Sequence, residues 1–201
     1  EVLLQLISEK ETLFEIYKNL GNIFTREADF DAAEEYYHRA FDIQPNSDAL
    51  LVNLGTLELQ QNEYNEAIDR FRKAIQINKK NDKAWVGLAL VHNHMGDRSL
   101  ALANIENAIE CNPKNRTAVQ VYANWAFQDG KYVHAIEVLQ NYLSLQEVDE
   151  EISLVLIQFL SQMNRFDLAH FEIERVLLWN PKSERLSQLE GELRKLAREI
   201  K

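Results

Sequence analysis

Hydrophobic residues recur three and four places apart along almost the whole chain. Tyr17, Leu20 and Phe24 have this spacing, and so do Ala33 and Tyr37 after a polar interval. Residues so spaced share one face of an α-helix, and the polar residues between them lie on the opposite face. The pattern therefore predicts a succession of amphipathic helices. The many Leu, Ala, Glu and Gln residues and the three prolines agree with an all-α protein.

A period of 34 residues underlies this pattern. It is marked by alanines and prolines in constant phase, namely Ala33, Ala67, Ala101, Ala135 and Ala169, with Pro45, Pro113 and Pro181. A period of this length indicates helical units that stack on their neighbours. It divides the chain into five repeats, 14–47, 48–81, 82–115, 116–149 and 150–183. Residues 1–13 fit the second helix of an incomplete preceding repeat, and residues 184–201 fit a C-terminal capping helix with Leu186, Leu189 and Leu193 on one face.

These units resemble the tetratricopeptide repeat. The first carries the pattern as Tyr17, Leu20, Gly21, Phe24, Ala33, Tyr37, Ala40 and Pro45, and the third as Trp85, Leu88, Ala89, Ala101, Ile105, Ala108 and Pro113. The match covers about 170 of the 201 residues. The resemblance implies a right-handed superhelical solenoid of antiparallel helix pairs. The fourth and fifth repeats are degenerate, with Val119 in place of an aromatic residue, Tyr142 at a small position and Ile157 at the glycine place.

A turn is expected between the two helices of each repeat. Asn62, Gly96, Gly130 and Asn164 stand there, and these residue types tolerate the left-handed backbone that ends many helices.

Charge and composition narrow the possible partners. The net charge is −10 and no basic stripe is visible, which argues against a nucleic-acid ligand. No apolar run is long enough to span a bilayer, and the opening "EVLLQLISEK" lacks the features of a secretory signal. We therefore expect a cytoplasmic protein without membrane insertion. Cys111 is the single cysteine, so no internal disulfide is possible and a buried thiol is expected.

Catalytic chemistry finds little support in the sequence. It has no glycine-rich phosphate loop, nucleophile elbow or cysteine pair. His92 and His94 are two residues apart on a helix and so point in different directions, unlike metal ligands on one face. The acids Glu150 and Glu151 are adjacent and expected to be solvated. The chain is therefore predicted to be no enzyme and to use neither metal nor cofactor.

A binding surface is the remaining candidate. In proteins that this chain resembles, the first helices of successive repeats line a concave groove for a partner peptide. Carried onto this sequence, the groove comprises Lys18, Asn19, Asn22, Asn53, Thr56, Lys83, Val86, Leu90, Asn93, Asn124, Phe127, Gln128, Leu154 and Gln158. Amide side chains both donate and accept, so a row of them can hold an extended peptide backbone, while the apolar members contact hydrophobic side chains.

Some members of the family grip a C-terminal carboxylate at this surface. Lys18, Asn22, Asn53 and Lys83 fall at the places of that clamp, but Gly87 replaces its final arginine. The remaining hypothesis is that an anionic segment of a partner binds near Lys18 and Lys83.

The leading hypothesis is thus a non-enzymatic adaptor or scaffold that binds a protein or peptide partner in its groove. Two alternatives stay open: a recruiting or regulatory region of a larger enzyme, and a self-assembling scaffold. The first helix of the fifth repeat is apolar nearly all round, so self-association through that repeat, at Leu154, is possible.

Overall fold

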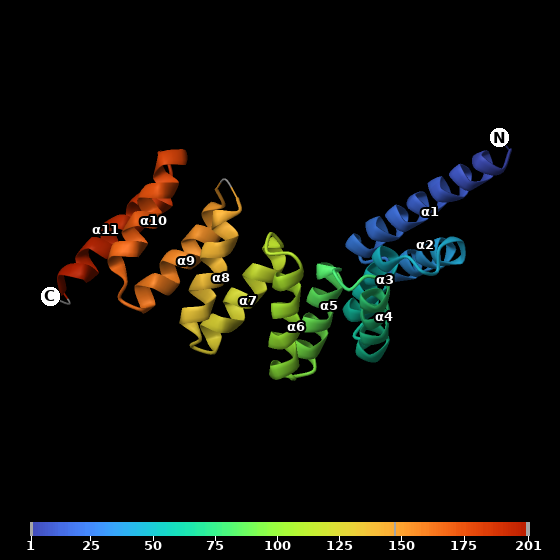
Figure 1. Ribbon diagram of the computed structural model, residues 1–201, viewed down its shortest axis with the longest axis horizontal. Helices are drawn as coiled ribbons and strands as arrows, with labels where there is room; N and C mark the ends of the chain where they lie inside the picture. Colours follow the sequence, from blue (N-terminus) through green and yellow to red (C-terminus); the bar gives the residue numbers. More distant parts are fainter. Residues whose placement is uncertain (1, 147, 200–201) are drawn as a thin grey trace. The chain divides into compact units, whose positions relative to one another are not determined.

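The computed structural model describes residues 2–146 and 148–199, and all the secondary structure in them is helical (Figure 1). The eleven helices are α1 Val2–Arg26, α2 Phe30–Ile43, α3 Asp48–Gln60, α4 Tyr64–Ile77, α5 Asp82–His94, α6 Arg98–Cys111, α7 Arg116–Gln128, α8 Tyr132–Ser144, α9 Glu150–Gln162, α10 Phe166–Trp179 and α11 Glu184–Glu199. The first ten of them form antiparallel pairs, one pair for each 34-residue repeat, and α11 follows the fifth pair. The predicted all-α fold is therefore confirmed. The chain divides into an N-terminal unit, Glu1–Asn112, and a C-terminal unit, Pro113–Lys201.

The core of the N-terminal unit is built where small residues face aromatic rings. A Cβ atom on Gly21 of α1 would collide with the ring of Tyr37 on α2, and one on Gly87 of α5 would collide with the ring of Phe71 on α4. Both rings are fully buried. Gly21 and Gly87 stand at different places in their repeats, and at both of them the close approach of a ring on a neighbouring helix requires a residue without a side chain.

The turns inside the repeats have the predicted backbone. Asn62, Gly96, Gly130 and Asn164 all have positive φ, between 55° and 82°. Ala28 holds the same place in the first repeat with φ 59°, although alanine has no intrinsic preference for this region.

Residues 2–13 depart from the sequence analysis. They continue α1, which is one helix of 25 residues, so a separate helix over 1–13 is wrong for the described residues. No glycine or proline occurs before Gly21 to interrupt it. The side chains of Leu3, Leu4 and Ile7 lie outside the described part. At the other end of the chain, Leu186 and Leu193 of α11 are buried.

Polar side chains join successive repeats at the start of their first helices. Asp48, the first residue of α3, accepts hydrogen bonds from Asn78 and Asn81 at 2.7 and 2.9 Å. Burial acts to raise the pKa of Asp48, but these two donors hold it below its ordinary value. The contact recurs one repeat later, where Asn112 donates to Asp82 at 2.7 Å.

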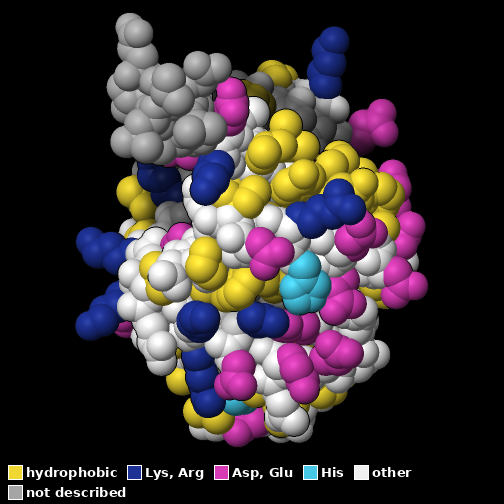
Figure 2. Space-filling model, turned by 90° about the vertical axis from the view of Figure 1, so that its right-hand side faces the viewer, with side chains coloured by type: hydrophobic (Ala, Val, Ile, Leu, Met, Phe, Trp, Pro, Cys, Tyr) yellow, Lys and Arg dark blue, Asp and Glu magenta, His cyan; other side chains and the backbone are white. Residues whose placement is uncertain are grey.

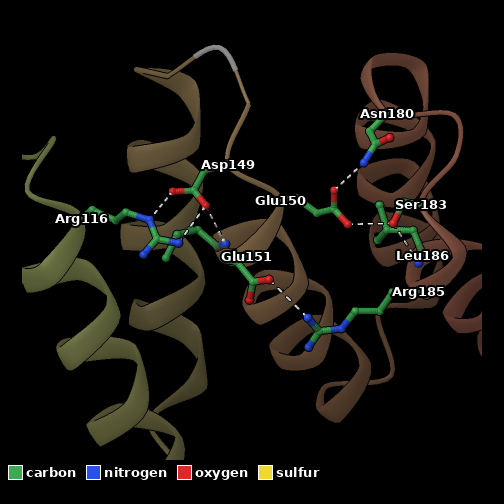
Figure 3. A network of polar contacts seen from close by, with 9 residues as sticks. Arg116, Asp149, Glu150, Glu151, Asn180, Ser183, Arg185 and Leu186 are labelled. Atoms are coloured by element: carbon green, nitrogen blue, oxygen red, sulfur yellow. Dashed lines mark hydrogen bonds and ion pairs between the residues drawn. The ribbon is translucent and has the colours of Figure 1, made fainter.

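The charge at this position is reversed in the fourth repeat. Arg116 stands where the second and third repeats carry Asp48 and Asp82, and it donates to Asp149 at 2.7 and 3.2 Å (Figure 3). Tyr142 occupies a place held by alanine in the first three repeats, and its hydroxyl donates to the same carboxylate at 2.9 Å. Burial acts to raise the pKa of Asp149, but Arg116, the Ile152 amide and Tyr142 together hold it below its ordinary value.

The next two acids belong to the same network (Figure 3). Glu150 accepts hydrogen bonds from Asn180 at 2.9 Å and from Ser183 at 2.7 Å. The prediction that its carboxylate is simply solvated is therefore wrong. Glu151 pairs with Arg185 of α11 at 3.3 Å and remains largely exposed. These contacts hold α9 against the residues that lead into the capping helix.

Candidate functional site

The predicted groove residues lie on the first helices of the repeats, on α1, α3 and α5 in the N-terminal unit and on α7 and α9 in the C-terminal unit. Asn19, Thr56, Lys83, Asn124, Gln128 and Gln158 are exposed, whereas Lys18, Asn22, Asn53, Leu90, Asn93 and Phe127 are half-buried and Val86 and Leu154 are buried.

Two of the predicted amides bind each other. Asn22 Oδ1 accepts hydrogen bonds from Tyr37 Oη and from Asn53 Nδ2, each at 2.8 Å. Because one oxygen receives both donors, the amide of Asn22 is fixed in orientation and its NH2 group is turned away from them. Asn22 therefore links α1, α2 and α3, and this structural role was missed in the sequence.

A hollow of about 270 Å³ lies beside Asn53 in the N-terminal unit. Val52 and Asn53 of α3 line one side, and Lys80 and Lys83 line the other. Lys83 is exposed, and the two lysines outnumber the one acid in the lining, Asp82, so the hollow favours an anionic ligand group.

The carboxylate clamp is incomplete for a physical reason. The Lys18 ammonium already pairs with Glu15 at 2.7 Å and lies 5.2 Å from the ring centroid of Phe14. The place of the final arginine is Gly87, where even a Cβ atom would collide with the Phe71 ring. Lys18 and Lys83 thus do not form that clamp with a third cation.

Three other predicted residues serve the packing. Val86 is buried, so it is not part of an open surface. Asn93 accepts a hydrogen bond from Arg98 at 2.9 Å. The ring of Phe127 packs against Tyr132 and Phe159, with centroids 5.7 and 5.4 Å apart. Helical spacing alone could not distinguish these inward positions from groove positions.

The C-terminal unit has a larger hollow, of about 380 Å³, between α9 and α11. Leu154 and Val155 of α9 and Leu189 of α11 supply its apolar part, while Gln158 and Gln188 supply amides. The ion pair of Glu151 and Arg185 belongs to its lining. Leu154 is 9% exposed and therefore forms the floor of this hollow instead of a projecting surface.

The α11 side of this hollow was missed by the sequence analysis. Gln188 and Leu189 lie in the segment identified only as a cap. Leu189 shares a face with the buried Leu186 and Leu193, but it is only half-buried, and helical periodicity alone could not indicate this difference.

The described residues offer no assembled chemistry. They contain no group of three or more His, Cys, Asp or Glu side chains placed to hold a metal ion. Cys111 is half-buried instead of fully buried, and its thiol lies 3.5 Å from the Lys79 carbonyl oxygen. Partial burial and the nearby Asp82 raise the pKa of this thiol, which disfavours the reactive thiolate.

Comparison with known proteins agrees with the geometry. Tetratricopeptide repeat profiles match residues 12–80, 58–124 and 126–193, so the chain belongs to the tetratricopeptide repeat family. Domains of this family are generally protein-interaction modules on a typically non-catalytic scaffold. No curated protein matches the sequence. Among the described residues, no helix is long and apolar enough to cross a membrane.

Solved structures with this fold include the MamA protein, which is 19% identical with a TM-score of 0.63 over 86% of this chain and 94% of that one. A tetratricopeptide repeat protein from Parabacteroides merdae is 20% identical, with a TM-score of 0.62 over 90% of this chain and 72% of that one. YrrB, described as a TPR protein with an unusual peptide-binding site, is 16% identical, with a TM-score of 0.59 over 95% and 98%. At these identities the likeness concerns the fold.

Proposed function

We propose that this chain is a non-enzymatic adaptor that binds an extended segment of a partner protein on the first-helix faces of its repeats. The observation that carries the proposal is the hollow between α9 and α11, where an apolar floor lies beside amide side chains. That YrrB is described as having a peptide-binding site is consistent with it.

The hollow in the C-terminal unit suits a peptide with one hydrophobic side chain. Leu154, Val155 and Leu189 would contact that side chain. Gln158 and Gln188 are exposed, and each can donate to a peptide carbonyl and accept from a peptide N–H. Amides on two facing helices would thus hold the backbone on both sides of the anchored residue.

The hollow in the N-terminal unit would take a different group. Lys80 and Lys83 favour an acidic side chain or a terminal carboxylate, and Asn53 supplies a further donor. The ligand that we expect at this hollow therefore presents an acidic side chain or a terminal carboxylate.

Selection from a displayed library of random peptides, followed by titration of the selected peptides, tests this proposal. Gln158→Ala and Gln188→Ala should each weaken binding by roughly fivefold to tenfold, about 1 kcal/mol for one lost hydrogen bond. Val155→Glu should weaken it further, because it places a charge on the apolar floor.

A matched control uses another exposed glutamine. Gln140 lines a different hollow, beside α10, so Gln140→Ala should leave the affinity unchanged. Equal affinities of all the variants and the wild type would refute binding at the hollow between α9 and α11.

A further inference from the structure

The outer face of α10 exposes two large hydrophobic side chains. Phe171 is 65% exposed and Leu178 is 86% exposed. They are seven residues apart, so they lie two helical turns from each other on the same face. Exposed single leucines are common on proteins, but two large apolar side chains on one solvent-facing row need an explanation.

The other repeats show that the fold does not require these residues. The places equivalent to Phe171 hold Glu35, Asp69, Ala103 and Glu137, and those equivalent to Leu178 hold Asp42, Gln76, Glu110 and Ser144. None of these is a large hydrophobic residue. Trp179 is different, because its place is apolar in every repeat, at Ile43, Ile77, Cys111 and Leu145. Phe171 and Leu178 are therefore specific to α10.

Exposed hydrophobic residues at the other end of the chain have a simpler cause. Hydrophobic side chains form a band in the upper part of Figure 2, which faces the end where α1 lies. Ile16 and Ile23 of α1 are 46% and 40% exposed. Their equivalents Leu50 and Leu57 are buried against α2, so Ile16 and Ile23 hold core positions that no described helix precedes. The same argument fails for Phe171 and Leu178, whose equivalents face solvent.

A hollow of about 270 Å³ adjoins Phe171. Leu143 of α8, Leu156 and Leu160 of α9, and Leu168 and Phe171 of α10 form its apolar lining. A projecting side chain and a recess that can receive one therefore lie on the same surface, which is the requirement for a self-complementary interface.

We propose that a second copy of this chain covers this face, with the two α10 helices antiparallel about a twofold axis. The register that places Phe171 opposite Leu178 of the second copy also places Glu174 opposite Arg175 of the second copy, although Arg175 already pairs with Glu172 of its own chain at 2.7 Å. It further places Asp167, at the start of α10 in one copy, opposite Lys182 of the second copy, which lies just beyond the end of its own α10. Parallel pairing would instead set each of these charges against its own kind. Charge complementarity thus selects the antiparallel arrangement.

The size of the patch predicts a weak dimer. Phe171 and Leu178 expose 65% and 86% of roughly 200 Å² each, which is about 600 Å² for two copies, so their surroundings must supply the other half of the lower limit of about 1,200 Å² for a specific interface. We expect reversible association with a dissociation constant in the micromolar range, on the order of 10 to 100 µM.

Sedimentation velocity from about 1 to 500 µM, a range that brackets this constant, provides the test. The wild type should shift from monomer to dimer across this range. The variant Phe171→Glu/Leu178→Gln introduces residues that other repeats carry at the same places, so it should fold normally and bind itself at least 100-fold more weakly. Ile16→Gln is the matched control and should dimerise as the wild type does.

Charge exchange tests the register. Asp167 and Lys182 are both exposed, so Asp167→Lys and Lys182→Asp should preserve the fold, and each should weaken self-association roughly threefold to tenfold. An equimolar mixture of the two variants should recover dimers, because opposite charges face each other again.

Three results would overturn the proposal. The first is a wild type that stays monomeric up to about 500 µM, which is well above the expected dissociation constant. The second is a dimer that persists in Phe171→Glu/Leu178→Gln. The third is loss of the dimer in Ile16→Gln alone. The first would leave the face to a different protein, and the last would assign self-association to α1. Failure of the mixed charge variants to associate would refute the antiparallel register. None of these outcomes depends on peptide binding between α9 and α11.

Discussion

Ala28 has a backbone conformation that its residue type disfavours, and replacing it with glycine should stabilise the protein. Its φ is 59°, in the left-handed region where a Cβ atom approaches the following carbonyl oxygen at a cost of roughly 1–2 kcal/mol. Glycine avoids this contact but loses about 0.5–1 kcal/mol more conformational entropy on folding. Ala28→Gly should therefore raise the free energy of unfolding by about 0.5–1 kcal/mol.

The reverse change at an equivalent turn should have the opposite sign. Gly96 has φ 82°, and a Cβ atom placed on it would meet nothing within 4 Å. Gly96→Ala therefore introduces backbone strain without a steric clash and should cost about 0.5–1 kcal/mol. Gly191 lies inside α11, also with open space around its Cβ position and no left-handed φ. There the same substitution should stabilise by about 0.5–1 kcal/mol, because alanine has the higher helix propensity.

Urea unfolding followed by circular dichroism measures all three variants. Ala28 and Gly96 belong to the N-terminal unit, so they should move the same unfolding transition in opposite directions. Near the thermal midpoint each change corresponds to a shift of roughly 1–4 °C. A destabilised Ala28→Gly variant, or Gly96→Ala and Gly191→Ala effects of equal sign, would refute the attribution to backbone conformation.

The remaining predictions concern buried and paired charges. Burial raises the pKa of Glu58 despite its 2.8 Å bond from Arg70, and one of its carboxylate oxygens lacks a partner among the described residues. Replacing the pair with the rings of the first repeat, as Glu58→Phe/Arg70→Tyr, should stabilise by about 1 kcal/mol in urea unfolding, whereas Arg70→Tyr alone should cost about 2 kcal/mol. A stabilising single change would contradict this. Because the pKa of Asp149 is lowered, its contribution to stability is complete above about pH 4 and is lost as the pH falls through the folded-state value. Unfolding measured from pH 6 to about pH 2 should therefore show a smaller acid loss for Asp149→Asn than for the wild type, and equal losses would refute the assignment. Tyr142→Phe removes one hydrogen bond to Asp149 and should cost about 1 kcal/mol, detectable as a lower urea midpoint.

The sequence was most informative where all five repeats obey one rule. Close helix packing requires a small residue at each constant-phase alanine, and Ala33 and its four equivalents are indeed fully buried. The left-handed turns at Asn62 and Gly96 were predictable because few residue types tolerate that conformation. The turn at Ala28 was not predictable, because only the surrounding repeat imposes its conformation.

The candidate site was predicted less well. The period places Asn22 and Asn53 on first helices, but it cannot show that their side chains are hydrogen-bonded to each other. The period also cannot show that the side chain of Val86 is buried. A residue that faces the neighbouring helix and a residue at the groove edge differ by only a small angle around the helix axis. The half of the C-terminal hollow formed by α11 was missed because that helix lies outside the five repeats.

Departures from the repeat pattern divide into two kinds, and the division bears on function. In the first repeat the rings of Phe24 and Tyr36 stack with centroids 5.4 Å apart, and in the second repeat the same two places hold the ion pair of Glu58 and Arg70. One departure therefore compensates another within the chain, as Arg116 and Tyr142 do by both donating to Asp149.

Phe171 and Leu178 belong to the second kind. Their side chains remain 65% and 86% exposed, so nothing in the described chain compensates for two hydrophobic residues at solvent-facing places. A substitution that costs solubility and gains no internal contact is explained if another molecule supplies the contact. The internal comparison of repeats thus separates Arg116, whose departure from the pattern has a contact within the chain, from Phe171 and Leu178, which remain exposed, and this difference is the ground on which we propose α10 as an interface.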